Sequence, residues 1–399
     1  MTSDTYDVIV VGGGPAGATA ADDLALQGYR VLLLDRQGRI KPCGGAIPPR
    51  LIKDFHIPDE LLVAKARAAR MVSPSDKKVD IPIEGGFVGM VNRDQFDEWL
   101  RVRAQNHGAV RQRGTFDKLT RDDDGISRVH FTVRTDDGLS FSASTRGKCI
   151  IGADGAKSEV ARQAVPGAEK TKYVFAYHEI VQTPANMVQT EADPSRCDVY
   201  YRGSLSPDFY GWVFPHGDTM SVGTGSADKG FSLRSAVGRL RDAAGLQQAT
   251  VLRREGAPLP MKPLPRWDNG RDVVLAGDAA GVVAPASGEG IYYAMLGGRL
   301  AAQAAHGLLS TGNAKALKLA RKMFMKDHGT VFWVLGIMQY FWYSNDKRRE
   351  SFVKMCEDKD VQKLTFDSYM NKKLERKKPL AHVKIFLKDM AHLMGMAKT

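Results

Sequence analysis

The chain of 399 residues is too long for a single hydrophobic core, and its 43% hydrophobic and 26% charged residues indicate a globular protein of two or more domains. The formal net charge of +12 predicts an anionic partner, either nucleic acid or a membrane surface. Four widely spaced cysteines without a Cys-x-x-Cys pair predict no disulfide framework and no metal site, as is typical of a reducing compartment.

The positive charge is concentrated near the C-terminus. Residues 315–399 contain 19 Lys and Arg against 9 Asp and Glu, so the rest of the chain is nearly neutral. The longest apolar run, residues 331–343, is too short to span a bilayer. The first predicted strand begins at Tyr6, which leaves no room for a targeting peptide. We therefore expect a cytoplasmic protein that is soluble or bound to a membrane surface.

The N-terminal residues predict one β-α-β unit. Residues 6–11 are an apolar run typical of a buried strand, and a helix is expected over residues 15–27. Gly28 ends this helix, and residues 30–34 form the next buried strand.

The turn between the first strand and the helix satisfies the G-x-G-x-x-G pattern. Its glycines permit a tight turn, close approach to a pyrophosphate and close packing of helix on strand, while the helix N-terminus attracts phosphates. The alternative is a glycine-rich turn without a ligand. The predicted dinucleotide contacts are Gly12, Gly14, Ala16, Gly17, Asp35, which is placed to accept hydrogen bonds from a ribose, and Arg36.

Further along the chain, residues 148–153 and 272–276 are two more buried strands that each lead into a glycine and an aspartate. Between them, short alternating segments predict an antiparallel sheet inserted into the α/β domain. These segments are 174–181, 197–202, 210–214 and 220–224. Residues 312–399 are expected to be helical, with breaks near Asn345 and Pro379.

Two later motifs separate FAD from NAD. The sequences GADGAKS at 152–158 and GDAAG at 277–281 each place a carboxylate after a buried strand. With the glycine fingerprint, in this order, they resemble the FAD-binding scaffold of the para-hydroxybenzoate hydroxylase type. Taken singly, each aspartate is explained as a helix cap. The resemblance implies FAD contacts by Arg93, Asp154, Gly155, Gly277, Asp278, which would hold the ribityl chain, and the flavin loop residues Gly288, Gly290 and Ile291.

The segment KPCGGAIPPR at 41–50 follows the ribose-binding strand, where this fold brings the chain back toward the flavin. Its paired glycines favour close approach of the backbone to a flat ligand, so Gly44, Gly45 and Ala46 are candidate cofactor contacts. Cys43 is a candidate proton donor. The alternative is that Cys43 is an inert small residue.

The segment PDFYGWVFP at 207–215 places Tyr210, Trp212 and Phe214 at alternate positions, which sends all three rings to one face of a strand. Pro215 is expected to end regular pairing because it lacks a backbone donor. Either this strand belongs to a buried core, or its rings form an apolar wall for a ligand.

The Cys-Gly-Gly segment, the three FAD motifs and this P-x-x-Y-x-W-x-F-P motif together resemble the geranylgeranyl reductase family over residues 6–310. Within the family, the 41–49 segment and the basic tail are most similar to the bacterial form of chlorophyll and bacteriochlorophyll synthesis. The resemblance implies FAD-dependent reduction of three isolated C=C bonds of a geranylgeranyl chain to phytyl, on the pigment ester or the diphosphate.

For that reaction, the resemblance implies NADPH or reduced ferredoxin as the electron donor. Tyr210, Trp212 and Phe214 would bind the chain, and Cys43, Tyr210 or water would supply the proton. Three alternatives stay open: a flavin monooxygenase on the same scaffold, a reductase of archaeal-type isoprenoid lipids, and a nucleic-acid-binding flavoprotein.

We expect a discontinuous FAD domain (1–70, 92–165 and 266–311), a substrate domain (71–91 and 166–265) and a basic helical region (312–399). The aromatics in 331–335 and 338–343 lie near the basic clusters 347–349 and 372–378, which favours binding to anionic membranes. We therefore predict a peripheral position on the cytoplasmic face of a photosynthetic membrane, with the pigment-esterifying synthase as a further partner and no nucleic acid. The alternative is a helical subdomain with a solvated charged face.

Overall fold

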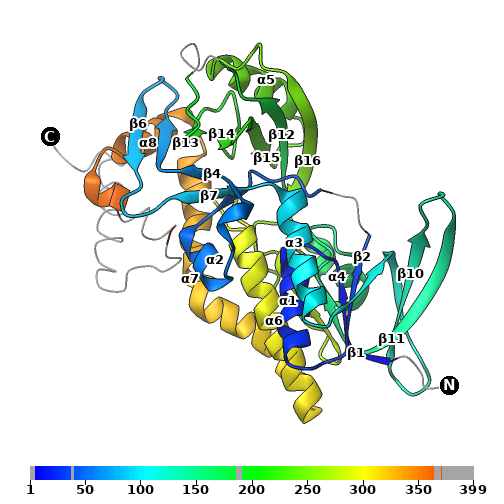
Figure 1. Cartoon of the computed structure of the whole chain (residues 1–399). Coiled ribbons are helices and arrows are strands. Elements are labelled where there is room, and N and C mark those ends of the chain that lie inside the picture. The colour runs from blue at the N-terminus through cyan, green and yellow to red at the C-terminus, as the bar shows by residue number, and fades with distance from the viewer. Residues whose placement is uncertain (1–4, 37–39, 186–190, 364–369, 371–399) are drawn as a thin grey trace.

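The computed structural model describes residues 5–36, 40–185, 191–363 and 370. Two seven-stranded sheets lie one above the other in Figure 1, joined by a small three-stranded sheet and flanked by helices. This is the α/β architecture with a second sheet and a helical C-terminal part that the sequence predicts.

The first sheet carries the predicted β-α-β unit. Its strand order is β8-β2-β1-β11-β10-β9, with β17 paired to β11. The central strand β1 is parallel to both β2 and β11. Where the three strands pair, at residues 8–11, 31–34 and 149–152, they are apolar and buried, as is typical of a parallel sheet covered on both faces. The strands are β1 (Thr5–Val11), β2 (Val31–Asp35), β8 (Val110–Arg113), β9 (Thr115–Arg121), β10 (Ser127–Arg134), β11 (Ser140–Gly152) and β17 (Val273–Leu275).

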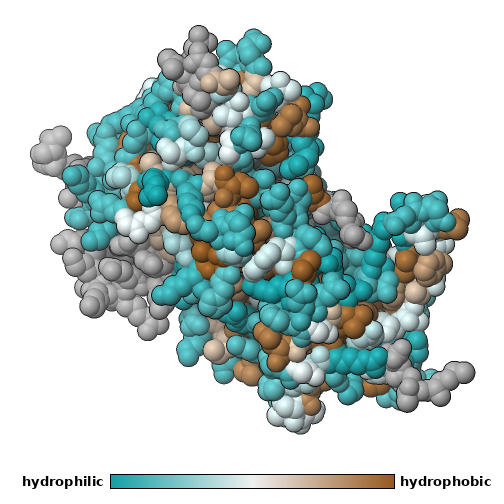
Figure 2. Space-filling view, viewed as in Figure 1, coloured by the Kyte–Doolittle hydropathy of each residue, from teal (hydrophilic) through white to brown (hydrophobic). Residues whose placement is uncertain are grey.

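Three helices, α1 (Pro15–Leu26), α3 (Arg93–Asn106) and α6 (Ile291–Thr311), stand side by side against this sheet (Figure 1). Helices α1 and α6 approach closely because a Cβ at Gly298 would lie only 2.1 Å from the carbonyl oxygen of Ala16. The hairpin of β10 and β11 projects from the body (Figure 1), and its apolar Leu139 and Phe141 are exposed near the tip. Figure 2 shows a mainly hydrophilic face on which apolar patches are scattered.

The second sheet has the order β16-β12-β15-β14-β13-β5-β6, and its neighbours are antiparallel except for the parallel pair β13 and β5. The strands are β5 (Ala68–Val72), β6 (Lys78–Pro82), β12 (Val174–Gln182), β13 (Arg196–Tyr200), β14 (Gly211–His216), β15 (Thr219–Ser226) and β16 (Val251–Leu259). The four segments predicted to form an inserted sheet are therefore neighbours in one sheet.

The expectation that Pro215 ends regular pairing is wrong. Strand β14 continues to His216, and Pro215 pairs with Met220 of β15. On its other side β14 pairs with β13 only as far as Val213. Proline is tolerated here because only one edge of the strand still has a partner strand.

The small sheet β3-β7-β4 lies between the two large sheets (Figure 1). Its strands are β3 (Ala46–Ile47), β4 (Leu62–Ala66) and β7 (Val88–Val91). The remaining helices before the C-terminal region are α2 (Pro49–Asp54), α4 (Glu159–Ala164), α5 (Leu233–Ala243) and the short 3-10 turns Asp59–Leu61, Ala168–Lys170 and Gly277–Ala280.

The C-terminal region is helical and is bound to the rest of the protein. A 3-10 turn (Ala314–Leu317) leads into α7 (Lys318–Trp342), and the predicted break near Asn345 separates α7 from α8 (Asp346–Met355). The side chain of Asn345 caps α8 by accepting a hydrogen bond from the backbone N–H of Arg348. The predicted break at Pro379 and the basic cluster 372–378 lie outside the described residues.

Arg349 is not the membrane-facing cation that the sequence suggests. It is 2% exposed, and its guanidinium donates to the carbonyl oxygens of Ser206 (3.0 Å) and Pro207 (2.6 Å) and also to that of Tyr343. A basic residue is buried here because three backbone carbonyls accept from its Nη2 and the carboxylate of Asp346 accepts from its Nη1 (2.7 Å). No helix among the described residues is long and apolar enough to cross a bilayer.

We predict that Arg349→Met will lower the free energy of unfolding by about 3 kcal/mol, because it leaves several buried carbonyl groups without a donor. Urea denaturation followed by circular dichroism measures the change. Lys347→Met, which replaces an exposed cation on the same helix, is the matched control and should cost far less. Equal losses in the two variants would contradict the structural role given to Arg349.

Candidate functional site

A cavity of about 830 Å³ opens at the carboxyl ends of the parallel strands β1 and β2. The glycine fingerprint, Asp35 and Arg36 line one part of it, and residues of β12 and β16 line another. Its volume and its position over the N-terminus of α1 fit a dinucleotide.

The glycines of the fingerprint have different structural roles. A Cβ at Gly12, where φ is +106°, would lie 2.3 Å from the carbonyl oxygen of Ala153, and one at Gly17 would lie 1.8 Å from that of Gly12. Both therefore serve packing. A Cβ at Gly14 would meet no atom within 4 Å, so this backbone is open to a ligand. Within the described structure, Ala16, Gly17 and Gly277 line neither of the two cavities described in this section.

Asp35 faces the cavity at the end of β2. Its carboxylate accepts a hydrogen bond from the backbone N–H of Gly13 (3.2 Å) and lies 3.5 Å from the guanidinium of Arg101. Arg101 also donates to the carbonyl oxygen of Gly13 (3.1 Å). The sequence reasoning missed Arg101.

A spacing of four residues on α3 could have revealed Arg101, because Arg93, Asp97 and Arg101 share one helix face and all line the cavity. Arg93 and Asp97 form a buried pair joined by two hydrogen bonds of 2.8 and 2.7 Å. Burial alone disfavours the charge of Arg93, but the Asp97 carboxylate more than offsets this and raises the pKa of Arg93. Arg93 therefore holds a fixed positive charge at the cavity, and it also interacts with the Cys43 thiol.

Asp154 performs the helix-cap role weighed from the sequence. Its carboxylate accepts from the backbone N–H groups of Glu159 (2.7 Å) and Val160 (3.1 Å) at the start of α4. Burial raises the pKa of Asp154, against the effect of these hydrogen bonds. Asp154 and Gly155 also line the dinucleotide cavity, so the capping role and a cofactor contact are compatible.

The dinucleotide cavity meets a second cavity at Lys41. Lys41 pairs with the carboxylate of Asp278, and both Lys41 and Arg93 line the two cavities. The sequence reasoning named Asp278 but missed Lys41, although Lys41 begins the KPCGG segment.

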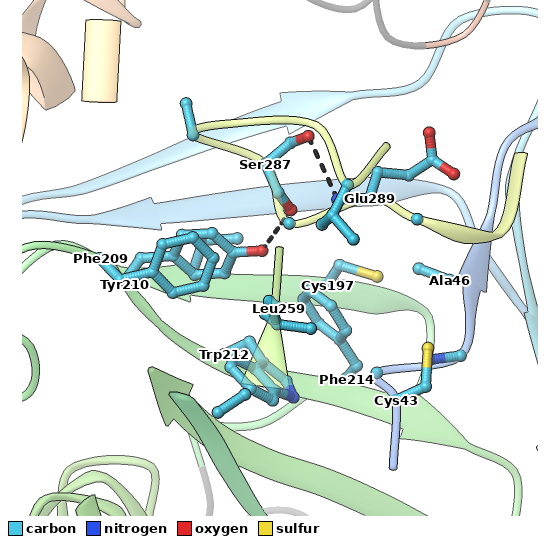
Figure 3. A pocket seen from close by; sticks show the side chains of 18 of the residues that line it. Cys43, Ala46, Cys197, Phe209, Tyr210, Trp212, Phe214, Leu259, Ser287 and Glu289 are labelled. Atoms are coloured by element: carbon cyan, nitrogen blue, oxygen red, sulfur yellow. Dashed lines mark hydrogen bonds between the residues drawn. The ribbon is translucent and has the colours of Figure 1, made fainter. Parts of the chain in front are cut away.

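The second cavity, of about 300 Å³, is mostly apolar. The rings of Tyr210, Trp212 and Phe214 lie in a row from the flavin loop toward Cys43, as Figure 3 shows. The strand thus presents its rings to a cavity and not to a sealed core. The predicted residues that line it are Cys43, Gly44, Gly45, Ala46, Arg93, Tyr210, Trp212, Phe214, Asp278, Gly288, Gly290 and Ile291.

Tyr210 joins the aromatic strand to the flavin loop. Its hydroxyl donates to the carbonyl oxygen of Ser287 (2.6 Å), and its ring stacks on Phe209 at 4.2 Å. Burial raises the pKa of Tyr210, so its phenol holds its proton firmly. Phe214 packs against the glycine segment, because a Cβ at Gly44 would lie 3.2 Å from its ring.

Cys43 lies at the other end of this row of rings (Figure 3). Its thiol accepts a hydrogen bond of 3.4 Å from the backbone N–H of Gly45 and is only half-buried. Cys43 lines the second cavity together with the neighbouring Gly44 and Gly45.

The far end of the second cavity is formed by residues that the sequence analysis did not assign to the site. The sequence predicts a position at a membrane surface for the segments 331–335 and 338–343, but Phe332, Trp342 and Tyr343 are buried. The lining residues come from the C-terminal helices and their ends, which carry no recognised motif, from β5, and from the position directly after β13. These residues are Met71, Tyr201, Leu335, Met338, Tyr343, Phe352 and Cys356.

Comparisons with known proteins agree with this geometry. A family model described as FAD binding domain matches residues 5–325. A geranylgeranyl diphosphate reductase of Rhodobacter capsulatus is 57% identical over 98% of both chains. A chloroplastic protein of the same name from Oryza sativa is 36% identical over 97% of this chain and 86% of its own.

A solved structure shares the fold. It is a geranylgeranyl bacteriochlorophyll reductase-like protein of Thermoplasma acidophilum, with a TM-score of 0.80 and 22% identity, and the match covers 94% of this chain and 99% of that one. The expected FAD-binding scaffold and FAD as the cofactor are therefore confirmed. The fingerprint cavity, the aromatic wall and these matches lead to one conclusion: the chain belongs to the FAD-binding-domain family and, within it, to the geranylgeranyl reductases.

Proposed function

We propose that the protein is an FAD-dependent reductase of isolated C=C bonds in a geranylgeranyl chain, giving phytyl in chlorophyll or bacteriochlorophyll synthesis. The observation that carries this proposal is the junction at Lys41 of a dinucleotide cavity with an apolar cavity walled by three aromatic rings. The names of the relatives support it. A polyene chain offers almost only apolar surface, so a wall of rings is the chemistry that would bind it.

When bound in its reduced form, FAD supplies a hydride to one carbon of the double bond. The second carbon then needs a proton, and the chain's own residues must hold it. The Tyr210 hydroxyl already donates to Ser287, and its raised pKa disfavours release of the proton. We therefore favour Cys43 as the proton donor and assign Tyr210 to positioning of the wall.

The polar residues around the dinucleotide cavity complete the proposal. Gly12, Gly14, Asp35, Arg36, Arg93 and Asp154 would hold the cofactor, with Gly44, Gly45 and the flavin loop near its ring system. NADPH is the proposed electron donor, with reduced ferredoxin as the alternative. The substrate is the pigment ester or the free diphosphate.

We predict that dithionite-reduced enzyme, mixed without oxygen with a geranylgeranyl pigment, will yield products that gain two hydrogen atoms for each reduced bond. Mass spectrometry of the pigment reads the result. A flavin monooxygenase would form no product without oxygen and would add oxygen in air. Absence of any hydrogen gain with both the pigment and geranylgeranyl diphosphate would overturn the proposal.

We predict that Cys43→Ala will keep FAD bound and lower turnover roughly a hundredfold, because the variant lacks the proton donor. Flavin absorbance measures cofactor content, and single-turnover oxidation of the reduced flavin by substrate measures the chemical step. Cys149→Ala, which removes a thiol from β11 that lines neither cavity, is the control. Unchanged turnover in Cys43→Ala would remove Cys43 from the mechanism.

We further propose that α7 holds the protein at an anionic membrane surface, on the cytoplasmic face of a photosynthetic membrane beside the pigment-esterifying synthase. Trp333 and Tyr340 are 68% and 85% exposed, and they share a helix face with exposed Leu319 and Lys326 because these residues are spaced by seven. Aromatic and apolar side chains beside a cation favour an anionic bilayer over nucleic acid.

We predict that Trp333→Ala with Tyr340→Ala will lower flotation with liposomes that contain anionic lipid severalfold, because the apolar contact is lost. Leu139→Ala with Phe141→Ala removes comparable exposed apolar area from the β10–β11 hairpin and is the control. Equal flotation of both double variants and the parent protein would contradict the role of α7. Deletion of the region is unsuitable because Tyr343 and Phe352 line the second cavity.

A further inference from the structure

Four residues form a row across four neighbouring strands of the second sheet. Glu255 on β16 pairs with His178 on β12, His178 pairs with Gly223 on β15, and Gly223 pairs with Trp212 on β14. Paired residues of antiparallel strands point to the same face. Since Trp212 and His178 both line the apolar cavity, the row lies on its wall.

The absence of a side chain at Gly223 leaves room for the indole of Trp212 in this row. A Cβ at Gly223 would lie 2.2 Å from Cζ2 of Trp212 and 2.6 Å from the Cβ of His178. The indole therefore lies across β15 in space that any other residue would fill. Its ring centre is 6.4 Å from that of His178.

A continuous hydrogen-bonded chain holds the indole there. The Nε1–H of Trp212 donates to the Oγ of Ser221 (3.1 Å), and this Oγ lies 2.9 Å from Nδ1 of His178. On the other side of the ring, Nε2 of His178 lies 3.0 Å from Oε2 of Glu255.

The chemistry of the groups at the two ends of this hydrogen-bonded chain, the Trp212 indole and the Glu255 carboxylate, decides which atoms donate there. Indole nitrogen only donates, so the Ser221 oxygen accepts from it, and the same oxygen is hydrogen-bonded to Nδ1 of His178. At the other end a carboxylate only accepts, so Nε2–H of His178 donates to Glu255. The polar side-chain atoms of this chain all have hydrogen-bond or ion-pair partners, although His178 is only 3% exposed.

The position of the indole has consequences for the reacting end of the cavity. A Cβ at Gly44 would lie 3.7 Å from Nε1 of Trp212, so the edge of the indole lies beside the Cys43 segment. Without an acceptor at Ser221, the buried N–H would cost free energy and the ring would turn to find another partner.

We propose that Ser221, His178 and Glu255 are positioning residues that fix the Trp212 indole and thereby set how the isoprenoid chain lies against the reacting centre. The proposal rests on the proposed function. A chain with several double bonds must bring each of them to the same reacting centre. If the Trp212 ring could rotate, the double bonds would be held there in different positions. The three residues are proposed to act through Trp212.

The test combines a spectroscopic signature with product analysis. The indole N–H resonance of Trp212, assigned by Trp212→Phe, is recorded for Ser221→Ala, Glu255→Ala and Glu255→Gln, each with FAD bound. The pair at Glu255 is matched, because Gln keeps an acceptor for His178 Nε2 while Ala removes it. Arg254→Ala, which removes a charge from the neighbouring position of β16 on the opposite face, is the control.

We expect the resonance to move in Ser221→Ala and Glu255→Ala and to stay near the parent position in Glu255→Gln and Arg254→Ala. We also expect KM for the geranylgeranyl substrate to rise roughly fivefold in the two Ala variants of the row, which corresponds to about one lost hydrogen bond, and partly reduced products to accumulate.

Two results would overturn the proposal. A resonance that is unchanged in Ser221→Ala and Glu255→Ala would show that the row does not hold the indole. A shifted resonance with unchanged KM and fully reduced product would show that the indole position does not set the chain. Failure of the proposed function is distinguishable, because the parent enzyme would then reduce no geranylgeranyl substrate while the resonance still responds. Glu255 is at the edge of the row and partly exposed, so its variants test the proposal even if Ser221→Ala fails to fold.

Discussion

The site depends on hydrogen bonds that hold the loop between Ala284 and Gly290 from two sides. The hydroxyl of Tyr210 donates to Ser287 (2.6 Å), and the hydroxyl of Tyr343 donates to Ala286 (2.9 Å). Ala286 has a φ of +61°, a conformation that costs a residue with a side chain about 1 kcal/mol or more. The loop keeps this conformation because the second sheet and helix α7 both bind its carbonyl groups. The second sheet, through Tyr210 just before β14, and the C-terminal region, through Tyr343 at the end of α7, therefore meet at this loop.

The same arrangement separates two kinds of chemistry. The dinucleotide cavity is lined by charged side chains that are paired with each other, such as Arg93 with Asp97. The cavity beyond Lys41 is lined mainly by rings, aliphatic side chains and thiols. Ion pairs are tolerated where water or a polar cofactor is present, whereas an apolar ligand requires apolar surroundings. The two cavities that share Lys41 therefore suit two different kinds of ligand.

Local patterns allowed much of this to be predicted. The fingerprint, the two aspartate motifs and the alternating rings are short, and their chemistry can be inferred from a few neighbouring residues. Lys41, Arg101 and Arg349 could not be assigned in the same way, because each acts on a partner far away in the sequence: Asp278, Asp35 and the carbonyl of Ser206. The prediction for Arg349 was wrong for that reason, since a cluster of cations in a sequence does not reveal which of them the fold buries. Pro215 was misjudged because its tolerance depends on where β13 stops pairing, which is a property of the sheet.

The histidine next to the aromatic row is kept neutral. His216 follows the aromatic row on β14, and a Cβ at Gly45 would lie 2.4 Å from its Nε2, so this imidazole touches the glycine segment. Burial lowers the pKa of His216 to about 4, which means that it is neutral at physiological pH. Behind Trp212, Glu255 pairs with both His178 and Arg253 at the edge of the sheet. His216 thus lies beside the aromatic wall without adding a charge to it. A charged imidazole at this position would attract water into the apolar cavity, and water beside the glycine segment would compete with an apolar ligand for that space.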